Sequence, residues 1–296
     1  MKPAPRYAII ANPASGKLSM DQRHARLKTV AEALGATLHG LDTRSPTELA
    51  RCARETAQHC DILVVAGGDG TFSLVLNAVD LDAVTLAFLP FGTGNALTYA
   101  LNYRGDLFAI AAAIRKGCCH RMDLIDCGMD ANRRKKAFMT SVGIDGAAIR
   151  RYEQYHAAGL RGLKAHLRAG IAAYLKDYRP TEGTLDLDGR HWRVDRLLSL
   201  MVVKQPYFGM GLKAVPRARW DDGALHIQVI NTGWIGLLTG LATGFTIGNR
   251  AGSHHAGSQL RLRLAAPLTL QIDGELAWTS DWFDFGVLPG ALQLQY

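Results

Sequence analysis

The sequence predicts two domains of different class: an α/β domain with a doubly wound, mainly parallel sheet, and then a mainly antiparallel, sandwich-like β domain. In the first part, short apolar runs alternate with helical patterns, which is typical of a parallel sheet covered by helices. Beyond about Asp123, short strand-like runs separated by Asp-Gly turns dominate. We therefore place the first domain at residues 1–125, completed by the tail 284–296, and the second at 126–283.

Each element of the first domain has a local signal. Tyr7–Ala11 is a continuous apolar run and is expected to be a buried strand. A capping box at Ser19 starts a helix that Gly35 closes, and the Ser-Pro pair at Ser45 starts another. The remaining strands are expected at 37–41, 61–66 and 85–89, with a helix at 72–78.

The second domain is expected to contain many short strands around a helical insert at 148–177. The stretch 227–249 has no charged residue and is about long enough to span a bilayer, but it contains polar residues and several glycines. We expect a strand and then a helix at 233–245, next to a lipid site or a membrane surface. The strands are predicted at 124–128, 137–142, 183–187, 197–203, 225–230, 259–264 and 268–272.

Composition limits the classes of function. The formal net charge of +8 among 296 residues favours anionic partners such as a nucleotide or an acidic membrane surface. No helix-turn-helix, zinc-finger or aromatic sheet motif is present, so a nucleic-acid partner is not expected. Five cysteines without a CxxC pair argue against a disulfide framework or zinc site and favour a reducing cytoplasm.

The stretch Gly67-Gly68-Asp69-Gly70-Thr71 lies where a strand is expected to turn into a helix. Glycines leave backbone N–H groups accessible, and a helix N-terminus favours anions, so this turn is suited to phosphate. A carboxylate beside a phosphate also requires a cation or a transferable proton, which points to phosphate chemistry. A tight strand-to-helix turn without a ligand is an equally good interpretation of this motif alone.

Two further loops follow strands of the same predicted sheet. Asn12-Pro13-Ala14-Ser15-Gly16-Lys17 follows the first strand, and Gly92-Thr93-Gly94-Asn95 follows the fourth. Ligands of open α/β sheets bind beyond the carboxyl ends of the strands. The three loops therefore predict one shared phosphate site, although none has the spacing of a Walker A loop.

Together these motifs resemble the diacylglycerol kinase catalytic-domain family, which includes bacterial lipid kinases, sphingosine kinases and ceramide kinases. The resemblance rests on NPxSG, GGDGT and GTxN in the first domain. It continues in the second with Gly143-Ile144-Asp145, Phe208-Gly209-Met210-Gly211, Asp222-Gly223-Ala224-Leu225 and Asp273-Gly274-Glu275.

The resemblance implies a first domain like that of NAD kinases and phosphofructokinases, a β-sandwich-like second domain, and an active site in the cleft between them. It implies transfer of the γ-phosphoryl group of ATP to a lipid hydroxyl, with Mg²⁺ as cofactor. The expected enzyme is cytoplasmic and peripherally associated with an anionic membrane, and a homodimer through strand edges of the β domain is an option.

Site residues follow from the matching motifs. The resemblance gives Asp222, with carbonyls at Arg219 and Ala224, as ligands of Mg²⁺. It gives Glu275 with Asp273 as the catalytic base, while Asp69 is an alternative that the sequence does not separate from this pair. The nucleotide is expected at Asn12, Thr43, Gly67, Gly68, Asp69, Gly70, Thr71, Gly92, Thr93 and Asn95.

One departure and several alternatives stay open. Ala96 stands where the family usually has Asp after GTxN, so one expected carboxylate is absent. The Asp-Gly pairs at Asp222 and Asp273 are also ordinary turn signals. The alternatives to a lipid kinase are an NAD kinase-like small-molecule kinase and a lipid- or nucleotide-binding regulator without turnover. The acceptor lipid is open among diacylglycerol, sphingoid bases, ceramide and other lipids.

Overall fold

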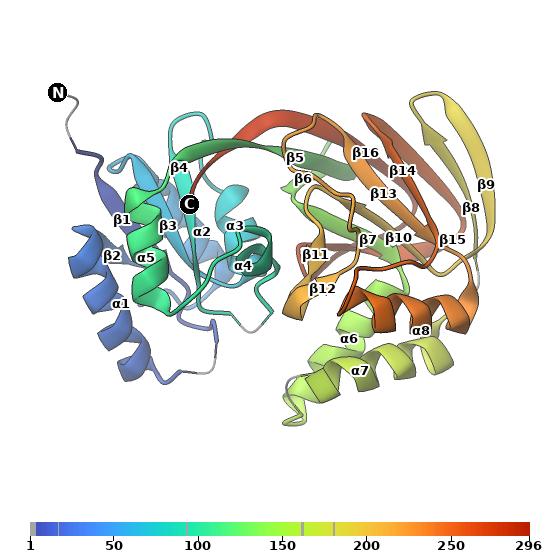
Figure 1. Ribbon diagram of the computed structural model, residues 1–296, viewed down its shortest axis with the longest axis horizontal. Coiled ribbons are helices and arrows are strands. Elements are labelled where there is room, and N and C mark those ends of the chain that lie inside the picture. Colours follow the sequence, from blue (N-terminus) through green and yellow to red (C-terminus); the bar gives the residue numbers. More distant parts are fainter. Residues whose placement is uncertain (1–3, 17, 93, 161–162, 180) are drawn as a thin grey trace. The chain divides into compact units, whose positions relative to one another are not determined.

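The computed structural model describes residues 4–16, 18–92, 94–160, 163–179 and 181–296, and the chain forms two compact units (Figure 1). The first unit consists of Met1–Met122 and Gly290–Tyr296, and the second of Asp123–Pro289. Two long strands, β5 (Cys119–Asp130) and β16 (Glu275–Gln295), pass from one unit to the other. The end of the chain therefore returns to the unit in which the chain began.

The first unit contains a parallel sheet. Its strand order is β2-β1-β3-β4, and Leu294 and Gln295 at the end of β16 pair in parallel with β4. Strands β1, β3 and β4 are buried on both faces, which explains why they are continuous apolar runs, whereas the short strand β2 is largely exposed. Their bounds are β1 (Tyr7–Ala11), β2 (Thr37–His39), β3 (Ile62–Gly67) and β4 (Thr85–Pro90).

Helices cover both faces of this sheet. Helix α1 (Met20–Leu34) and helix α5 (Leu107–Lys116) form one core with β1, β3 and β4. Helix α2 (Pro46–Ala57) contacts α3 (Asp69–Leu76), and Phe72 of α3 meets Phe88 of β4 edge to face at 5.7 Å. A short helix, α4 (Ala96–Ala100), follows β4. The doubly wound fold predicted for this part is confirmed.

The predicted helix caps of the first unit are confirmed. Ser19 forms the capping box with Gln22, and Gly35 closes α1 with φ at 65°. The side chain of Ser45 accepts the backbone N–H of Glu48 at the start of α2. The prediction for the second strand was too long, because β2 ends at His39 rather than at residue 41.

The second unit is antiparallel, as predicted. A sheet of order β14-β13-β10-β7-β15-β16 is joined by β8 and β9 beside β15, and by β5 and β6 beside β16. Its core contains inward-facing residues such as Val142, Leu200, Ile227, Leu270 and Phe283. The new strands are β6 (Arg133–Ala137), β7 (Met139–Gly143), β8 (Thr181–Leu187), β9 (Arg190–Leu197), β10 (Ser199–Val203), β13 (Leu225–Ile230), β14 (Ser253–Gly257) and β15 (Gln259–Ile272).

The helical insert and the apolar helix of the second unit are present. The insert consists of α6 (Ile144–Ala157), α7 (Leu163–Ala172) and a π-helical turn η1 (Ala173–Asp177). The apolar helix is α8 (Gly233–Gly244). A small hairpin of β11 (Tyr207–Phe208) and β12 (Leu212–Lys213) encloses the turn η2 (Gly209–Gly211). Over the described ranges, no helix is long and apolar enough to cross a bilayer.

The prediction of separate strands at 259–264 and 268–272 was wrong. Residues Gln259–Ile272 form the single strand β15, which pairs with β16. The pairing shifts register between Arg263 and Leu268, where the sequence had shown a break. The sequence break that we interpreted as a turn between two strands is therefore an irregularity in the pairing of one strand, β15, with β16.

Candidate functional site

Two of the three predicted loops are joined by hydrogen bonds at the carboxyl edge of the first unit's sheet. The side-chain amide of Asn12 donates to Thr71 Oγ1 at 2.8 Å. Ser15 Oγ lies 3.1 Å from the same hydroxyl oxygen. The loop after β1 is therefore fixed to the first turn of α3, where backbone N–H groups and the helix dipole favour an anion.

The loops after β3 and β4 approach each other closely at two glycines. A Cβ placed on Gly92 would lie only 2.5 Å from the Cα of Gly68, a distance that no side chain tolerates. The backbone N–H groups of Phe91 and Gly92 both donate to the carbonyl of Gly67, at 2.8 and 3.1 Å. Glycine is thus required at this contact for packing as well as for access to the backbone.

Asp69 connects α3 to α4. Its Oδ2 accepts the backbone N–H of Ala96 at 2.7 Å and its Oδ1 that of Leu97 at 3.2 Å, so it acts as a cap for α4 from a distant part of the chain. Burial raises the pKa of Asp69 to about 6 and outweighs the lowering effect of the two backbone hydrogen bonds. Ala96, which replaces the family's Asp, is fully buried.

Asn95 contributes a buried acceptor to this edge. It adopts a left-handed conformation with φ at 37°, and its Nδ2 donates to the carbonyl of Gly92 at 2.7 Å. Its Oδ1 is buried, and no described residue donates a hydrogen bond to it. An unsatisfied buried oxygen is costly and suits a donor supplied by a ligand. The expected nucleotide residue Thr93, and Lys17 of the first loop, lie outside the described residues.

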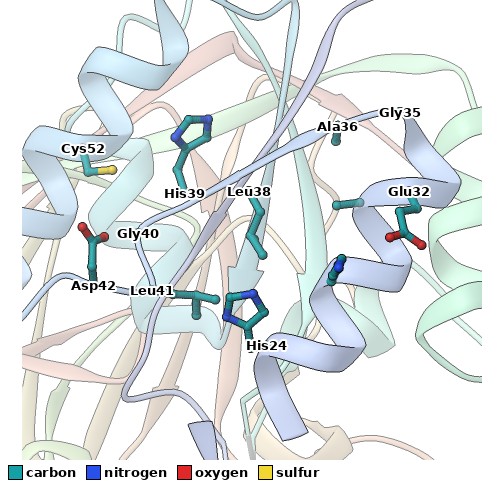
Figure 2. A pocket seen from close by; sticks show the side chains of 12 residues that line it. His24, Glu32, Gly35, Ala36, Leu38, His39, Gly40, Leu41, Asp42 and Cys52 are labelled. Atoms are coloured by element: carbon teal, nitrogen blue, oxygen red, sulfur yellow. The ribbon is translucent and has the colours of Figure 1, made fainter. Parts of the chain in front are cut away.

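Thr43 lies in the turn after β2, outside the three glycine-rich loops. Its hydroxyl donates to the carbonyl of Gly40 at 2.7 Å and stabilises the turn after β2. Beside this turn lies a groove of about 730 Å³ (Figure 2). Residues of α1, β2, the turn and α2 line this groove, whereas none of the glycine-rich loops contributes to it: His24, Lys28, Ala31, Glu32, Gly35, Ala36, Leu38, His39, Gly40, Leu41, Asp42 and Cys52.

In the second unit, Asp273 and Glu275 have different environments although both lie at the β15–β16 turn. Asp273 is fully buried, and its Oδ1 accepts the backbone N–H groups of Phe138 at 3.1 Å and Met139 at 2.9 Å. Its φ of 48° and the φ of 91° at Gly274 form the tight hairpin turn expected of Asp-Gly. Glu275 is exposed. Asp273 therefore supports the backbone, and Glu275 is accessible.

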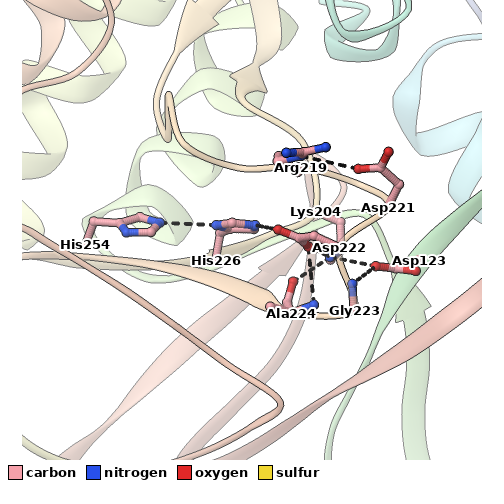
Figure 3. Close-up of polar contacts among 9 residues, drawn as sticks. All are labelled: Asp123, Lys204, Arg219, Asp221, Asp222, Gly223, Ala224, His226 and His254. Atoms are coloured by element: carbon pink, nitrogen blue, oxygen red, sulfur yellow. Dashed lines mark hydrogen bonds and ion pairs between the residues drawn. The ribbon is translucent and has the colours of Figure 1, made fainter.

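The expected metal ligands at Asp222 and Ala224 are hydrogen-bonded to an amine of the protein itself (Figure 3). The Nζ of Lys204 lies 2.9 Å from Asp222 Oδ1 and donates to the carbonyl oxygen of Ala224. At Arg219 the expected ligand is the backbone carbonyl, and the side chain pairs with Asp221 at 3.5 Å. Within the described part of the chain, no group of three acidic, His or Cys side chains is arranged to hold a metal. These residues do not fit a divalent ion.

A chain of imidazoles extends from Asp222. Its Oδ2 lies 2.9 Å from His226 Nε2, and His226 Nδ1 lies 3.2 Å from His254 Nε2. Burial raises the pKa of Asp222, but the hydrogen bonds from Lys204 and His226 together outweigh burial and lower that pKa. Burial lowers the pKa of His226 despite Asp222. Burial also lowers the pKa of His254 to about 4, and the neighbouring His226 and Arg217 lower it further by disfavouring a second positive charge. Both imidazoles are therefore neutral near pH 7.

Sequence reasoning missed Lys204, Asp123 and His226. Lys204 directly follows the apolar strand β10, and a lone lysine in that position was a signal that a buried cation needs partners. Its partner Asp123 is far away in sequence, so the sequence alone did not indicate the pair.

Comparison with family models identifies the chain. Residues 6–127 match the model described as "Diacylglycerol kinase catalytic domain". Residues 139–296, more than half of the chain, match "YegS C-terminal NAD kinase beta sandwich-like domain". The chain belongs to the diacylglycerol kinase catalytic-domain family. The predicted resemblance is thus confirmed.

Relatives of this diacylglycerol kinase family member are similar over most of their length. A diacylglycerol kinase of Bacillus subtilis (strain 168) is 24% identical over 96% of this chain and 92% of its own length. A protein named "Probable lipid kinase YegS-like" from Stenotrophomonas maltophilia is 28% identical over 76% of each chain.

Solved structures support the two-part fold. A diacylglycerol kinase from Bacillus anthracis superposes with a TM-score of 0.79 and 20% identity, covering 100% of this chain and 98% of its own. An NAD kinase from Archaeoglobus fulgidus in complex with ATP superposes with a TM-score of 0.53 and 12% identity, covering 98% and 93%. These likenesses confirm the predicted fold class of this family member.

We predict that Asp69 makes the ligand-free protein more stable at about pH 5 than at about pH 7. Its pKa of about 6 in the folded chain lies above its ordinary value, so the folded state holds the proton more tightly. Stability is gained as pH falls through 6 and lost as it rises. Relative to Asp69→Asn, the free energy of unfolding of the wild type should increase by roughly 1 kcal/mol between these pH values.

Urea unfolding of both proteins at the two pH values measures this difference. Asp82→Asn, which removes an exposed carboxylate of the same unit, is the control and should follow the wild type. Parallel pH profiles for wild type and Asp69→Asn would contradict a partly buried, proton-retaining Asp69.

We also predict that Asp273→Ala destabilises the fold by about 2–4 kcal/mol, because two buried N–H groups lose their acceptor. Asp273→Asn should cost less, since Asn keeps an acceptor and tolerates the left-handed conformation. Glu275→Ala, two residues away and exposed, should stay within about 0.5 kcal/mol of the wild type. Equal urea midpoints for Asp273→Ala and Glu275→Ala would refute a structural role of Asp273.

Proposed function

We propose that this protein is a lipid kinase that transfers the γ-phosphoryl group of Mg-ATP to a hydroxyl of a membrane lipid. The observation that carries the proposal is the joined set of loops at the carboxyl edge of the first unit's sheet. Asn12, Ser15 and Thr71 meet there, and the glycines after β3 and β4 let the backbones of these two loops pack directly against each other. Family membership supports the same reaction class.

The proposed phosphate site uses fixed partial charges. Phosphoryl transfer requires positioning and neutralisation of charge more than covalent help from the protein. The first turn of α3 supplies N–H groups and the positive end of a helix dipole. Asn95 Oδ1 is a ready acceptor for a hydroxyl or for water on the Mg²⁺ that ATP brings with it. The proposed nucleotide residues are Asn12, Thr43, Gly67, Gly68, Asp69, Gly70, Thr71, Gly92, Thr93 and Asn95.

Among the three candidate carboxylates, Glu275 is the proposed base. Both oxygens of Asp69 accept backbone N–H groups of α4, and Asp273 is buried and supports β7. Glu275 is exposed and can reach the proton of an acceptor hydroxyl. Asp273 then acts as a positioning residue for Glu275, and Asp69 organises the phosphate edge by holding α4.

A membrane surface is the proposed source of the acceptor. Helix α8 exposes Trp234, Ile235 and Leu238, which are 58%, 60% and 54% exposed and lie within one face of the helix. Phe245 and Ile247, which follow the end of α8, are exposed as well. Exposed apolar side chains on a helix that carries no charged residue suit insertion into the interface of a bilayer. The net charge of +8 favours an anionic one.

The reaction is tested with purified protein, labelled ATP, Mg²⁺ and either lipid vesicles or NAD. We expect label in extracted lipid and none on NAD. Glu275→Gln should lower kcat at least about 100-fold with nucleotide affinity unchanged, because only proton transfer is lost. Glu153→Gln, the same change at an exposed position in the same unit, should retain full activity.

Three outcomes count against these assignments. Label on NAD would favour a small-molecule kinase, and nucleotide binding without transfer to any acceptor would favour a regulator. Wild-type turnover in Glu275→Gln would remove Glu275 as the base.

Membrane contact is tested by cosedimentation with vesicles of phosphatidylglycerol and phosphatidylcholine. Replacing Trp234 and Ile235 together by Ser should weaken binding at least about tenfold, since each buried apolar side chain contributes about 1.5–3 kcal/mol. Phe108→Ser changes an exposed aromatic residue of α5 and should bind like the wild type. Equal vesicle binding by all three proteins would exclude α8 as the contact.

A further inference from the structure

Lys204 is a buried amine with three acceptors. It directly follows β10, and its side chain is only 1% exposed. An ammonium group has three N–H donors, and burying it without partners is very unfavourable. Its Nζ lies 2.9 Å from Asp123 Oδ2 and 2.9 Å from Asp222 Oδ1, and it donates to the carbonyl oxygen of Ala224 (Figure 3). Every donor of the ammonium is therefore matched.

The oxygens around Lys204 are engaged by other donors too. Asp222 Oδ1 also accepts the backbone N–H of Ala224 at 3.3 Å, while Asp222 Oδ2 is bound to His226 at 2.9 Å. Asp123 Oδ2 accepts the backbone N–H of Gly223 at 2.7 Å. The loop from Asp222 to Ala224 is thus folded around the ammonium through both side chains and backbone.

A divalent metal ion does not fit this arrangement. Mg²⁺ requires nearly octahedral oxygen ligands at about 2.0–2.1 Å. Two of the oxygens that the family resemblance assigned to it, at Asp222 and Ala224, already bind the ammonium. An ion held by the same oxygens would also lie next to a fixed positive charge and be repelled by it.

We infer that Lys204 is the built-in cation of the Asp222–Ala224 loop and replaces a bound divalent metal ion there. The ammonium supplies one positive charge that the buried Asp123 and the partly buried Asp222 share. The loop is consequently ordered without metal. Removing the lysine would leave two carboxylates and one carbonyl without their shared cation, and oxygens of these kinds are the ligands that Mg²⁺ and Mn²⁺ prefer.

The wild-type protein gives the first test, without nucleotide and without turnover. Thermal unfolding is followed in excess EDTA and in Mg²⁺, and binding of Mn²⁺ is followed by its electron paramagnetic resonance signal. We expect the same Tm in both solutions and no Mn²⁺ binding that depends on Asp222. A Tm that falls in EDTA and recovers in Mg²⁺, with the response lost in Asp222→Asn, would overturn the inference.

Variants give the second test. Lys204→Ala should have a lower Tm, bind Mn²⁺ at least about tenfold more tightly than the wild type, and regain part of its Tm in Mg²⁺. Lys204→Ala combined with Asp222→Asn should gain no Mn²⁺ binding. Lys135→Ala, at an exposed lysine of the same unit, should behave like the wild type.

Two results with Lys204→Ala would contradict the inference: an unchanged Tm, or a folded variant that takes up no Mn²⁺. Should Lys204→Ala not fold, the comparison of the wild type with Asp222→Asn decides alone. Because no measurement uses turnover, failure here is distinguishable from failure of the proposed kinase reaction.

Discussion

The close approach of Gly68 and Gly92 is the contact on which the phosphate edge depends. Parallel strands bring their carboxyl ends to one edge, but the loops that follow can share that edge only if their backbones come close together. A side chain at Gly92 would collide with the backbone of Gly68. With both glycines in place, the loops after β3 and β4 pack directly, and Asn12 and Ser15 complete the edge from the loop after β1.

This packing explains why Asp69 has a structural role in addition to any role in the chemical reaction. The same approach brings the start of α4 next to α3, so the N–H groups of Ala96 and Leu97 find an acceptor in Asp69. Ala96 is buried at this point, where a further carboxylate would have to be accommodated close to Asp69. The replacement of Asp by Ala at this position therefore leaves a single carboxylate with both of its oxygens used.

Much of the fold could be predicted because its signals are local. Strands β1 and β13 agree with the prediction at both ends: β1 is a continuous apolar run, and β13 is a mainly apolar run that follows an Asp-Gly turn signal. Helix α1 begins and ends at caps that are readable in the sequence. Helix α5 was missed although Asp106 caps it, accepting the N–H groups of Phe108 and Ala109. Strand β16 was missed because its sequence contains Gly and Pro and because one of its partners, β4, is far away in the sequence.

The candidate site could likewise be predicted where it depends on local motifs, and could not where it depends on residues far apart in the sequence. The glycine-rich loops are local motifs, and sequence order alone placed them at one edge. The environments of the second unit's carboxylates depend on distant partners: Asp273 on the backbone at Phe138 and Met139, and Asp222 on Lys204.

A motif can therefore keep its residues while its chemistry changes. The Asp-Gly-x-Leu block is present at Asp222, as in the family pattern, yet the positive charge it needs comes from a lysine eighteen positions earlier in the chain. A buried carboxylate requires compensation, but it does not specify whether a metal ion or an ammonium supplies it. Assigning a metal to such a block thus requires inspection of the side chains that surround it as well as of the block itself.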